Sequence, residues 1–291
     1  MSEPALRIDA HMHWWSIQRQ DYGWLTPELT ALYRDFGPTQ ADPLLAAARI
    51  DGVILVQAAP TVNETRYLFE LARSRAYVRG VVGWADFNDV AQLESLACQP
   101  TLLAVRPMLQ DLAEDDWILQ SALKPALRLL EDLGLPFEAL IYPRHLPVLR
   151  HLLDRHPRLR VMIDHAAKPD IAARSLEPWN ADLAALAAAP QVWCKLSGLM
   201  TEARPEDAMA VLAPYVDALF NGFGVERVVW GSDWPVATLR LDYAGWLRGC
   251  EALTGALSAA QQAQIFGGNA ERFYARGRGA ASTMEVNTDV D

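Results

Sequence analysis

Short apolar segments alternate with amphipathic segments along almost the whole chain, and this alternation limits the possible folds more than any other feature. Strand-like segments are expected at residues 8–13, 52–57, 77–84, 102–106, 136–142, 159–165, 192–197 and 227–232. Helical patterns are expected between and after them, at about 42–49, 61–75, 90–97, 117–133, 146–155, 178–188, 205–220, 242–253 and 258–274. Eight strand–helix units in roughly 250 residues predict an α/β protein with a (β/α)8 TIM barrel of parallel strands.

The predicted barrel forms a single domain. A doubly wound open sheet is the alternative fold, but the glycine-rich turn G-x-G-x-x-G that usually follows its first strand does not occur in the sequence. No linker divides the chain, so we assign residues 1–275 to the barrel. Residues 276–291 are small and polar, and we expect them to form a flexible C-terminal tail.

Charge and composition limit the binding partners and the cellular compartment that we expect. A net charge of −10 and a pI near 5.1 argue against nonspecific binding to nucleic acid. Cys98, Cys194 and Cys250 form no CxxC pair and are too few for a disulfide framework, which favours a reducing compartment. The N-terminus lacks a basic segment followed by an apolar run, and no stretch approaches about 18 apolar residues. We therefore expect a cytoplasmic protein with no nucleic-acid or membrane partner, and we leave a homo-oligomer open.

Polar residues gather at the ends of the predicted strands, where active sites of this type of barrel lie. In an extended first strand, Asp9, His11 and His13 would project from one face. Two imidazoles aimed at one point suit a divalent metal ion or proton transfer. The other polar groups at strand ends are Gln57, Trp84, Asp86, Arg106, Tyr142, Arg144, His145, Asp164, His165, Lys168, Lys195, Ser197, Ser232 and Asp233. Burying such a group unpaired costs about 2 to 7 kcal/mol, so a shared polar pocket is expected.

Several of these residues also have a purely structural interpretation. His145 precedes a helix and is expected to be exposed, and His151 and His156 are expected on the surface. Arg106 is either a substrate contact or a structural ion-pair partner. Lys195 lies inside an otherwise apolar strand, so its ammonium group must find an anion or a ligand.

Three motifs at strand ends give the chain a family resemblance: His11-x-His13, Asp164-His165 and Gly231-Ser232-Asp233-Trp234-Pro235. With these motifs on the first, sixth and eighth strands, the chain resembles the amidohydrolase superfamily. The closer likeness is to its amidohydrolase-2 branch, and there to sugar-lactone hydrolases of the L-fuconolactonase and L-rhamnonolactonase type. The likeness runs nearly end to end and includes residues 21–25, 56–58, 63–66, 82–84, 142–146, 164–169, 194–199 and 266–270.

The resemblance implies a hydrolase that opens a sugar lactone in carbohydrate catabolism. Asp233 would deprotonate the attacking water, while His11, His13 and His165 would position that water, ligate a metal ion or donate a proton to the leaving alkoxide. One divalent ion, with zinc favoured, would be held by His11, His13 and Asp233 with help from His165. Metal-independent catalysis is the alternative.

The resemblance also implies substrate contacts around the pocket. These are Trp24, Gln57, Trp84, Arg106, Tyr142, Arg144, Lys195 and Trp234, in which the tryptophans either stack on a sugar ring or only pack. Arg106, Lys195 or the metal ion would stabilise the negative charge on the carbonyl oxygen.

The chain departs from its family pattern in two places. Pro107 stands where many such lactonases carry a histidine, so the substrate contacts there are expected to differ. Tyr142 and Arg106 stand on strands five and four where the wider superfamily has metal ligands, so a two-metal centre is not expected.

Three other functions stay open from the sequence. A lactone dicarboxylate, such as a pyrone or muconolactone, would need several cations, which Arg106, Arg144, Lys195 and Arg240 offer. A decarboxylase of the same branch would release carbon dioxide without ring opening. A barrel that binds a sugar acid without turnover would belong to a different class of protein, and the presence of Asp233 speaks against it.

Overall fold

Eight parallel strands form one sheet in the order β1 to β8 in the part of the chain, residues 5–275, that the computed structural model describes. The strands are β1 (Ile8–Met12), β2 (Gly52–Val56), β3 (Val78–Gly83), β4 (Leu102–Val105), β5 (Phe137–Ala139), β6 (Val161–Ile163), β7 (Val192–Leu196) and β8 (Val228–Trp230). A parallel bridge between Met12 and Trp234 joins the first strand to the chain that leaves the last one. The predicted (β/α)8 barrel is therefore confirmed.

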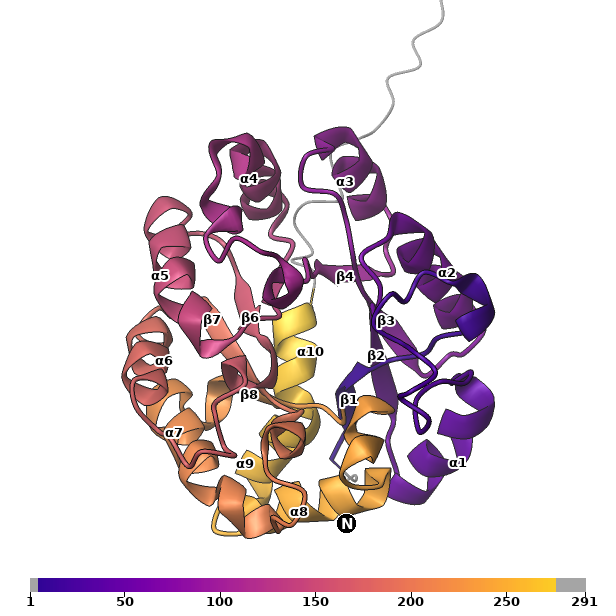
Figure 1. Ribbon diagram of the computed structural model, residues 1–291, viewed down its shortest axis with the longest axis vertical. Coiled ribbons are helices and arrows are strands. Elements are labelled where there is room, and N and C mark those ends of the chain that lie inside the picture. The colour runs from indigo at the N-terminus through magenta and orange to yellow at the C-terminus, as the bar shows by residue number, and fades with distance from the viewer. Residues whose placement is uncertain (1–4, 276–291) are drawn as a thin grey trace, which may run out of the picture.

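Helices surround this sheet, as Figure 1 shows. They are α1 (Pro38–Ala48), α2 (Val62–Arg73), α3 (Val90–Ala97), α4 (Lys124–Leu133), α5 (Leu146–Arg155), α6 (Trp179–Ala187), α7 (Ala213–Phe223), α8 (Tyr243–Leu253), α9 (Ala259–Ala263) and α10 (Asn269–Tyr274). Helices α4 and α7 begin later than the sequence predicts. Pro125 and Pro214 lie in their first turns, where a missing backbone N–H is not needed and the fixed φ of proline favours the start of a helix.

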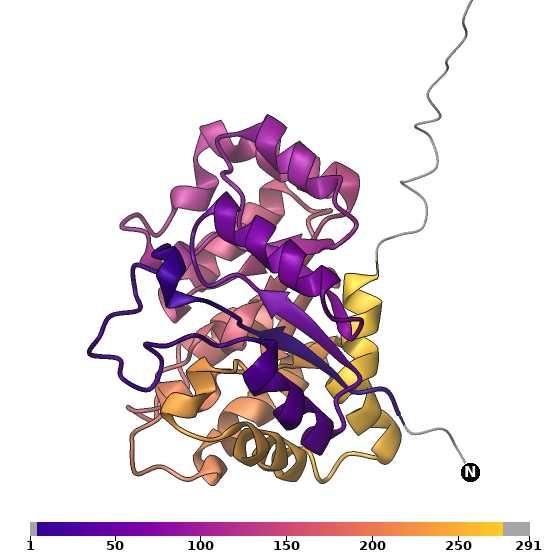
Figure 2. The same cartoon turned by 90° about the vertical axis from the view of Figure 1, so that its right-hand side faces the viewer.

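The barrel is closed at the N-terminal ends of its strands by helix α10 (Figure 2). Ala270, Phe273 and Tyr274 of this helix pack into one buried cluster with apolar residues of the strands, including Ile54 and Met162. A larger apolar cluster fills the space between the sheet and the outer helices. Because apolar packing closes this end of the barrel, polar chemistry is confined to the barrel axis and to the mouth, which is the opening at the C-terminal ends of the strands.

The long segment between β1 and α1 projects from the mouth, on the side away from α10 (Figure 2). It is tied down by an antiparallel bridge between Trp15 and Phe36 and by the Trp15 indole N–H, which donates to the carbonyl of Arg34 at 2.8 Å. Edge-to-face contacts of Trp15 with Trp24 and Phe36 add apolar packing. This segment is therefore an ordered wall of the mouth.

A register shift in β1, between Asp9 and Met12, changes which side chains face the barrel axis. The carboxylate of Asp9 accepts hydrogen bonds from Tyr243 Oη at 3.0 Å and from the backbone N–H of Ser232 at 2.8 Å. Asp9 thus points toward α8 and fastens β1 to the chain after β8. The strict alternation that predicts Asp9 in one row with His11 and His13 is wrong for Asp9, because the bulge re-aims the side chains that follow it.

Two expected features lie at the limits of the described chain. The predicted tail, residues 276–291, lies outside the described residues, and the boundary after residue 275 stays a prediction. None of the helices in residues 5–275 has the length and apolar character needed to span a bilayer.

Candidate functional site

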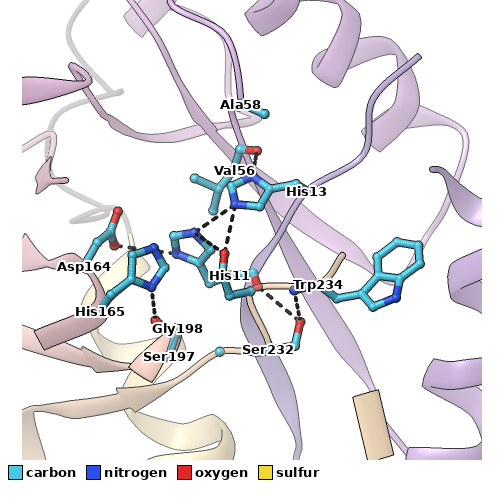
Figure 3. A network of polar contacts seen from close by, with 12 residues as sticks. His11, His13, Val56, Ala58, Asp164, His165, Ser197, Gly198, Ser232 and Trp234 are labelled. Atoms are coloured by element: carbon cyan, nitrogen blue, oxygen red, sulfur yellow. Dashed lines mark hydrogen bonds and ion pairs between the residues drawn. The ribbon is translucent and has the colours of Figure 1, made fainter. Parts of the chain in front are cut away.

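Three histidines and one aspartate meet at the mouth of the barrel, and we call His11, His13, His165 and Asp233 the mouth cluster. The backbone brings its first and last members together, because Asp233 N–H donates to the His11 carbonyl at 2.8 Å and His13 N–H donates to the Trp234 carbonyl at 2.7 Å. Figure 3 shows the imidazole of His11 between those of His13 and His165. The rings of His11 and His165 are 4.5 Å apart, and those of His11 and His13 are 4.9 Å apart.

The backbone at two members of the mouth cluster is left-handed. Asp233 has a φ of 57°, and the four consecutive residues from His165 to Lys168 have φ between 51° and 58°. Non-glycine residues rarely adopt this region, and such strain persists only where the surrounding structure enforces it. The short β6 and β8 strands therefore end in turns that hold His165 and Asp233 toward the axis.

His13 is oriented by the carbonyl of Val56. That carbonyl can only accept, so His13 Nδ1 carries a proton and donates at 2.8 Å. His13 Nε2 then faces Asp233 Oδ1 at 3.2 Å. Burial opposes the charge of Asp233, yet attraction to His165 and the contact with His13 hold the pKa of this carboxyl below its usual range. Asp233 is therefore an anion at neutral pH.

His165 is held by a hydrogen bond of 2.9 Å between its Nδ1 and the hydroxyl of Ser197. Burial lowers the pKa of His165 to about 4, so the ring is neutral at pH 7. Gly198, with a φ of 63°, lies against the same ring: a Cβ atom there would be 2.6 Å from His165 Nδ1 and 3.2 Å from Asp233 Oδ2. Only a glycine satisfies both the backbone and the space.

Below the mouth cluster lies a second polar group, the floor cluster, made of Lys195, Glu138, Asp164 and Arg106. Lys195 Nζ is 2.6 Å from Glu138 Oε2 and 3.1 Å from Asp164 Oδ1. Arg106 Nη1 donates to the other oxygen of Asp164 at 3.0 Å. The expectation that the ammonium of Lys195 finds an anion is confirmed, and it finds two.

The floor cluster also supports the mouth. Lys195 Nζ is 3.1 Å from His11 Nδ1, and Arg106 Nη1 is 3.4 Å from His11 Nε2. Burial, and then the charge of Lys195, lower the pKa of His11 well below its ordinary value, so this ring is neutral.

Gln57 and Arg106 hold each other at the ends of β2 and β4. The amide nitrogen of Gln57 donates to the Arg106 carbonyl at 2.8 Å, and the Arg106 guanidinium donates to the Gln57 carbonyl. Both side chains are almost fully buried. Gln57 Oε1 has no hydrogen-bond partner among the described residues, so it is available to a hydroxyl group.

The remaining predicted substrate residues lie around the mouth. Arg144 is about half exposed, pairs with Asp115 at 2.7 Å and lies over the ring of Tyr142. Trp24 donates its indole N–H to the Ala58 carbonyl at 2.7 Å, and Trp84 is partly buried beside Thr65.

Trp234 stands apart from the mouth cluster, because its indole points away from the three imidazoles (Figure 3). It packs edge-on against Phe36, and both line a cavity of about 440 Å³ with Arg34 and Thr238. No member of the mouth cluster lines this cavity.

Two histidines differ from their expected positions. His145 and His156 are buried, with 2% and 4% of their surface exposed, whereas both are predicted to be exposed. Each has a polar partner that accounts for burial: Tyr142 N–H donates to His145 Nδ1 at 3.1 Å, and His156 Nδ1 lies 2.9 Å from Glu131 Oε2. Neither imidazole joins the mouth cluster.

Two residues of the site are not singled out by the sequence. Glu138 is the sole charged residue of the strand segment Phe137–Ala139, and it is fully buried. Like Lys195, it is a charged residue inside an apolar strand. This shared pattern is a signal from which an ion pair between the two residues could be predicted. Gly198 follows a polar strand end, and a glycine there signals a close approach of the backbone to another group.

The mouth cluster fits a divalent metal ion of the kind that the family resemblance implies. His13 Nε2 and Asp233 Oδ1 are both acceptors when His13 is neutral, and two buried acceptors 3.2 Å apart need a cation, which is either a proton or a metal ion. His11, His165 and Asp233 each offer one ligand atom, and these atoms lie within 4.8 Å of one another. Imidazole nitrogens with one carboxylate oxygen suit zinc.

Comparisons with known proteins match this arrangement to one family. A family model described as amidohydrolase matches residues 8–276. The chain is 46% identical over 277 residues to an L-fucono-1,5-lactonase of Burkholderia ambifaria, covering 93% of this chain and 96% of that protein. It is 35% identical over 286 residues to an L-fucono-1,5-lactonase of Burkholderia multivorans, with the same coverage of both chains.

A solved structure extends the match to the fold. A crystal structure of an amidohydrolase from Burkholderia multivorans with bound zinc superimposes with a TM-score of 0.89 at 34% sequence identity. The match covers 94% of this chain and all of that one.

Proposed function

This chain belongs to the amidohydrolase family, and from that membership we propose that it is a lactonase that opens the ring of a sugar lactone. The substrate class is that of L-fucono-1,5-lactone, on which the two Burkholderia relatives act. The observation that carries the proposal is the contact of 3.2 Å between His13 Nε2 and Asp233 Oδ1 at the mouth of the barrel. This contact puts an anionic base beside a fixed imidazole.

Asp233 is the proposed general base. It accepts a proton from water as the oxygen of that water forms a bond to the lactone carbonyl carbon. It then returns the proton to the ring oxygen as the carbon–oxygen ester bond breaks. The carboxylate is regenerated, and the product is a hydroxy acid that ionises at neutral pH. The carbonyl of Val56 fixes the His13 ring and the hydroxyl of Ser197 fixes the His165 ring, so both imidazoles orient the water at the same point.

A single divalent ion, with zinc favoured, is the proposed cofactor, and His11, His13, His165 and Asp233 would hold it. When bound, such an ion polarises a carbonyl oxygen and lowers the pKa of water. The zinc in the related structure supports this assignment. The reaction depends equally on this chain's own residues, because Asp233 must both stay ionised and reach the water.

The charges around the pocket favour a neutral sugar lactone over a dicarboxylate. Four cations could serve a dicarboxylate, and two of them, Lys195 and Arg106, are already paired with Glu138 and Asp164. Arg144 is paired with Asp115, and the guanidinium of Arg240 donates to the backbone carbonyls of residues 203 and 204. A sugar ring needs hydroxyl partners and an apolar surface instead: Gln57 Oε1 is an acceptor for a hydroxyl, and the aromatic wall of the mouth offers the surface.

A panel of lactones read by a pH indicator tests this function. We expect the chain to open L-fucono-1,5-lactone and related neutral aldonolactones faster than a pyrone dicarboxylate by at least about tenfold. Preference for the dicarboxylate would identify the alternative hydrolase, and carbon dioxide release without ring opening would identify a decarboxylase. Thermal stabilisation by lactones without product would identify a binding protein.

Removal of metal tests the cofactor. Protein purified without chelator should contain close to one zinc per chain, and stripping the ion should lower the rate of lactone opening by about a hundredfold or more. Re-addition of zinc should restore the rate. Stripped protein that keeps the parent rate would establish metal-independent catalysis in place of this proposal.

We further propose that the protein works in the cytoplasm, in carbohydrate catabolism. Its three cysteines are free, Cys98 being exposed and Cys194 and Cys250 buried, which supports a reducing compartment. Measurement of lactonase activity in fractionated cells tests the location, and activity in the periplasmic or membrane fraction would contradict it.

A further inference from the structure

The ammonium group of Lys195 lies in the floor cluster, where it is enclosed by acceptor atoms. Lys195 comes from β7 and has no exposed surface. Its Nζ lies 2.6 Å from Glu138 Oε2, 3.1 Å from Asp164 Oδ1 and 3.1 Å from His11 Nδ1. An ammonium group has three N–H donors and no acceptor. Glu138 Oε2 accepts one of them, Asp164 Oδ1 lies at ion-pair distance, and His11 Nδ1 accepts another when the ring proton is on Nε2.

The three acceptor atoms form a site for a cation. One oxygen of Glu138, one oxygen of Asp164 and one nitrogen of His11 lie within 4.8 Å of one another, a spacing at which they could hold one metal ion. The other oxygens of the carboxylates are taken, by Tyr274 Oη and by Arg106. Asp164 Oδ1 has no hydrogen-bond partner among the described residues and lies 3.1 Å from the ammonium nitrogen and 3.6 Å from His11 Nδ1.

Lys195 supplies the second positive charge of the floor cluster. Glu138 and Asp164 bring two carboxylates into a fully buried space, and Arg106 accounts for one of them. Without Lys195, the second carboxylate would be left buried and unpaired, which proteins avoid by binding an ion or a proton.

We propose that Lys195 is a built-in cation that fills a second cation site of the barrel, and that removing its ammonium opens this site to a divalent metal ion. The ligands are Glu138, Asp164 and His11 Nδ1, a set of oxygen and imidazole donors that suits Mn²⁺ or Zn²⁺. The site lies on the Nδ1 side of the His11 ring, whereas His13 and Asp233 lie on its Nε2 side. It rests on the floor contacts alone and does not depend on the proposed lactonase activity.

The test counts metal ions in Lys195→Ala. The parent and the variant are equilibrated with Mn²⁺ or Zn²⁺, freed of unbound ion, and measured for metal content per chain. We expect Lys195→Ala to bind one ion more than the parent. Where an ion also occupies the mouth cluster, His11 loses its ring proton and bridges the two ions through Nδ1 and Nε2. Lys168→Ala is the matched control, because Lys168 lies at the mouth and donates to the Gln110 amide oxygen, and its metal content should equal that of the parent.

A double variant locates the extra ion. Lys195→Ala with Glu138→Ala removes the ammonium together with its closest anion, and its metal content should return to that of the parent. An extra ion in the double variant would place the ion elsewhere. Equal metal content in Lys195→Ala and the parent would overturn the proposal.

Folding gives a second readout, because Lys195→Ala without metal leaves a carboxylate buried and unpaired. We expect Mn²⁺ to raise the melting temperature of Lys195→Ala by several degrees more than that of the parent or of the double variant. The proposal would also be contradicted if Lys195→Ala stayed unfolded with Mn²⁺ and with Zn²⁺ while the double variant folded.

Discussion

The mouth and floor clusters are both buried groups of polar residues in the barrel, yet their polar atoms are arranged for opposite purposes. In the floor cluster, the ammonium of Lys195 lies beside the carboxylates of Glu138 and Asp164, so charges of opposite sign face one another. At the mouth, His13 Nε2 and Asp233 Oδ1 lie 3.2 Å apart, and both are acceptors when the His13 ring is neutral. The charges of the floor cluster are therefore balanced by other residues of the chain. The acceptor atoms of the mouth cluster instead need a proton, a metal ion or a substrate between them.

The difference predicts how variants behave. Changes on the floor should lower the stability of the fold, because they leave buried charges unpaired. Changes at the mouth should lower turnover while the fold survives, because the strained groups there are held for reaction rather than for packing. The following variants test this division, from the largest expected effect to the smallest.

Asp233→Asn should lower kcat for lactone opening by about a thousandfold or more, because an amide cannot accept the proton of water. Asparagine tolerates the left-handed φ of 57° at this position, so the fold should be retained. Steady-state rates and thermal melting measure the two effects. A variant that turns over at the parent rate would refute the role of Asp233 as base.

Glu138→Ala should lower the free energy of unfolding by about 3 to 5 kcal/mol, because Lys195 loses its closest anion in a fully buried position. Denaturation by urea measures this loss. The change in kcat per folded chain should be far smaller than that of Asp233→Asn. A loss of stability below about 1 kcal/mol would show that the floor is less tightly balanced than its distances imply.

Gly198→Ala tests the link between backbone and mouth. The new Cβ would meet the ring of His165, so we expect about 2 kcal/mol of lost stability and about a hundredfold lower turnover from the displaced imidazole. Gly134→Ala is the matched control: its φ of 60° is nearly the same, but no atom lies within 4 Å of the added carbon. It should lose only about 1 kcal/mol and keep its turnover. Equal effects of the two variants would remove the argument for the His165 contact.

Arg144→Ala should have the smallest effect. The guanidinium is about half exposed and pairs with an equally exposed Asp115, so the free energy of unfolding should change by less than about 0.5 kcal/mol. KM should rise by no more than about twofold to threefold. A much larger rise in KM would move Arg144 from the rim into the substrate site.

The barrel and the location of the mouth cluster follow from the sequence, because both depend on local patterns. Each strand and helix has its own apolar periodicity, and parallel strands all end at the same face. His11, His13, His165 and Asp233 therefore meet as expected from their places at strand ends. The proline-containing starts of α4 and α7 also carry a local signal, which the apolar pattern alone overlooks.

The remaining features depend on contacts between distant parts of the chain. The bulge that places Asp9 on a different face from His11 and His13 has no residue signal of its own. The pairing of Glu138 with Lys195 requires the radius of the barrel and the register of β5 and β7, which no local pattern specifies. The burial of His156 likewise depends on Glu131, a partner on a different helix.

The oxygen atom that enters the product tests most directly whether Asp233 activates water at the mouth. One turnover of L-fucono-1,5-lactone is run in ¹⁸O-labelled water with the protein in excess over the lactone, and product and protein are analysed by mass spectrometry. We predict one ¹⁸O in the carboxylate of the product and none in the peptide that contains Asp233. Unlabelled product together with ¹⁸O in Asp233 would contradict the account, because Asp233 would then be the nucleophile.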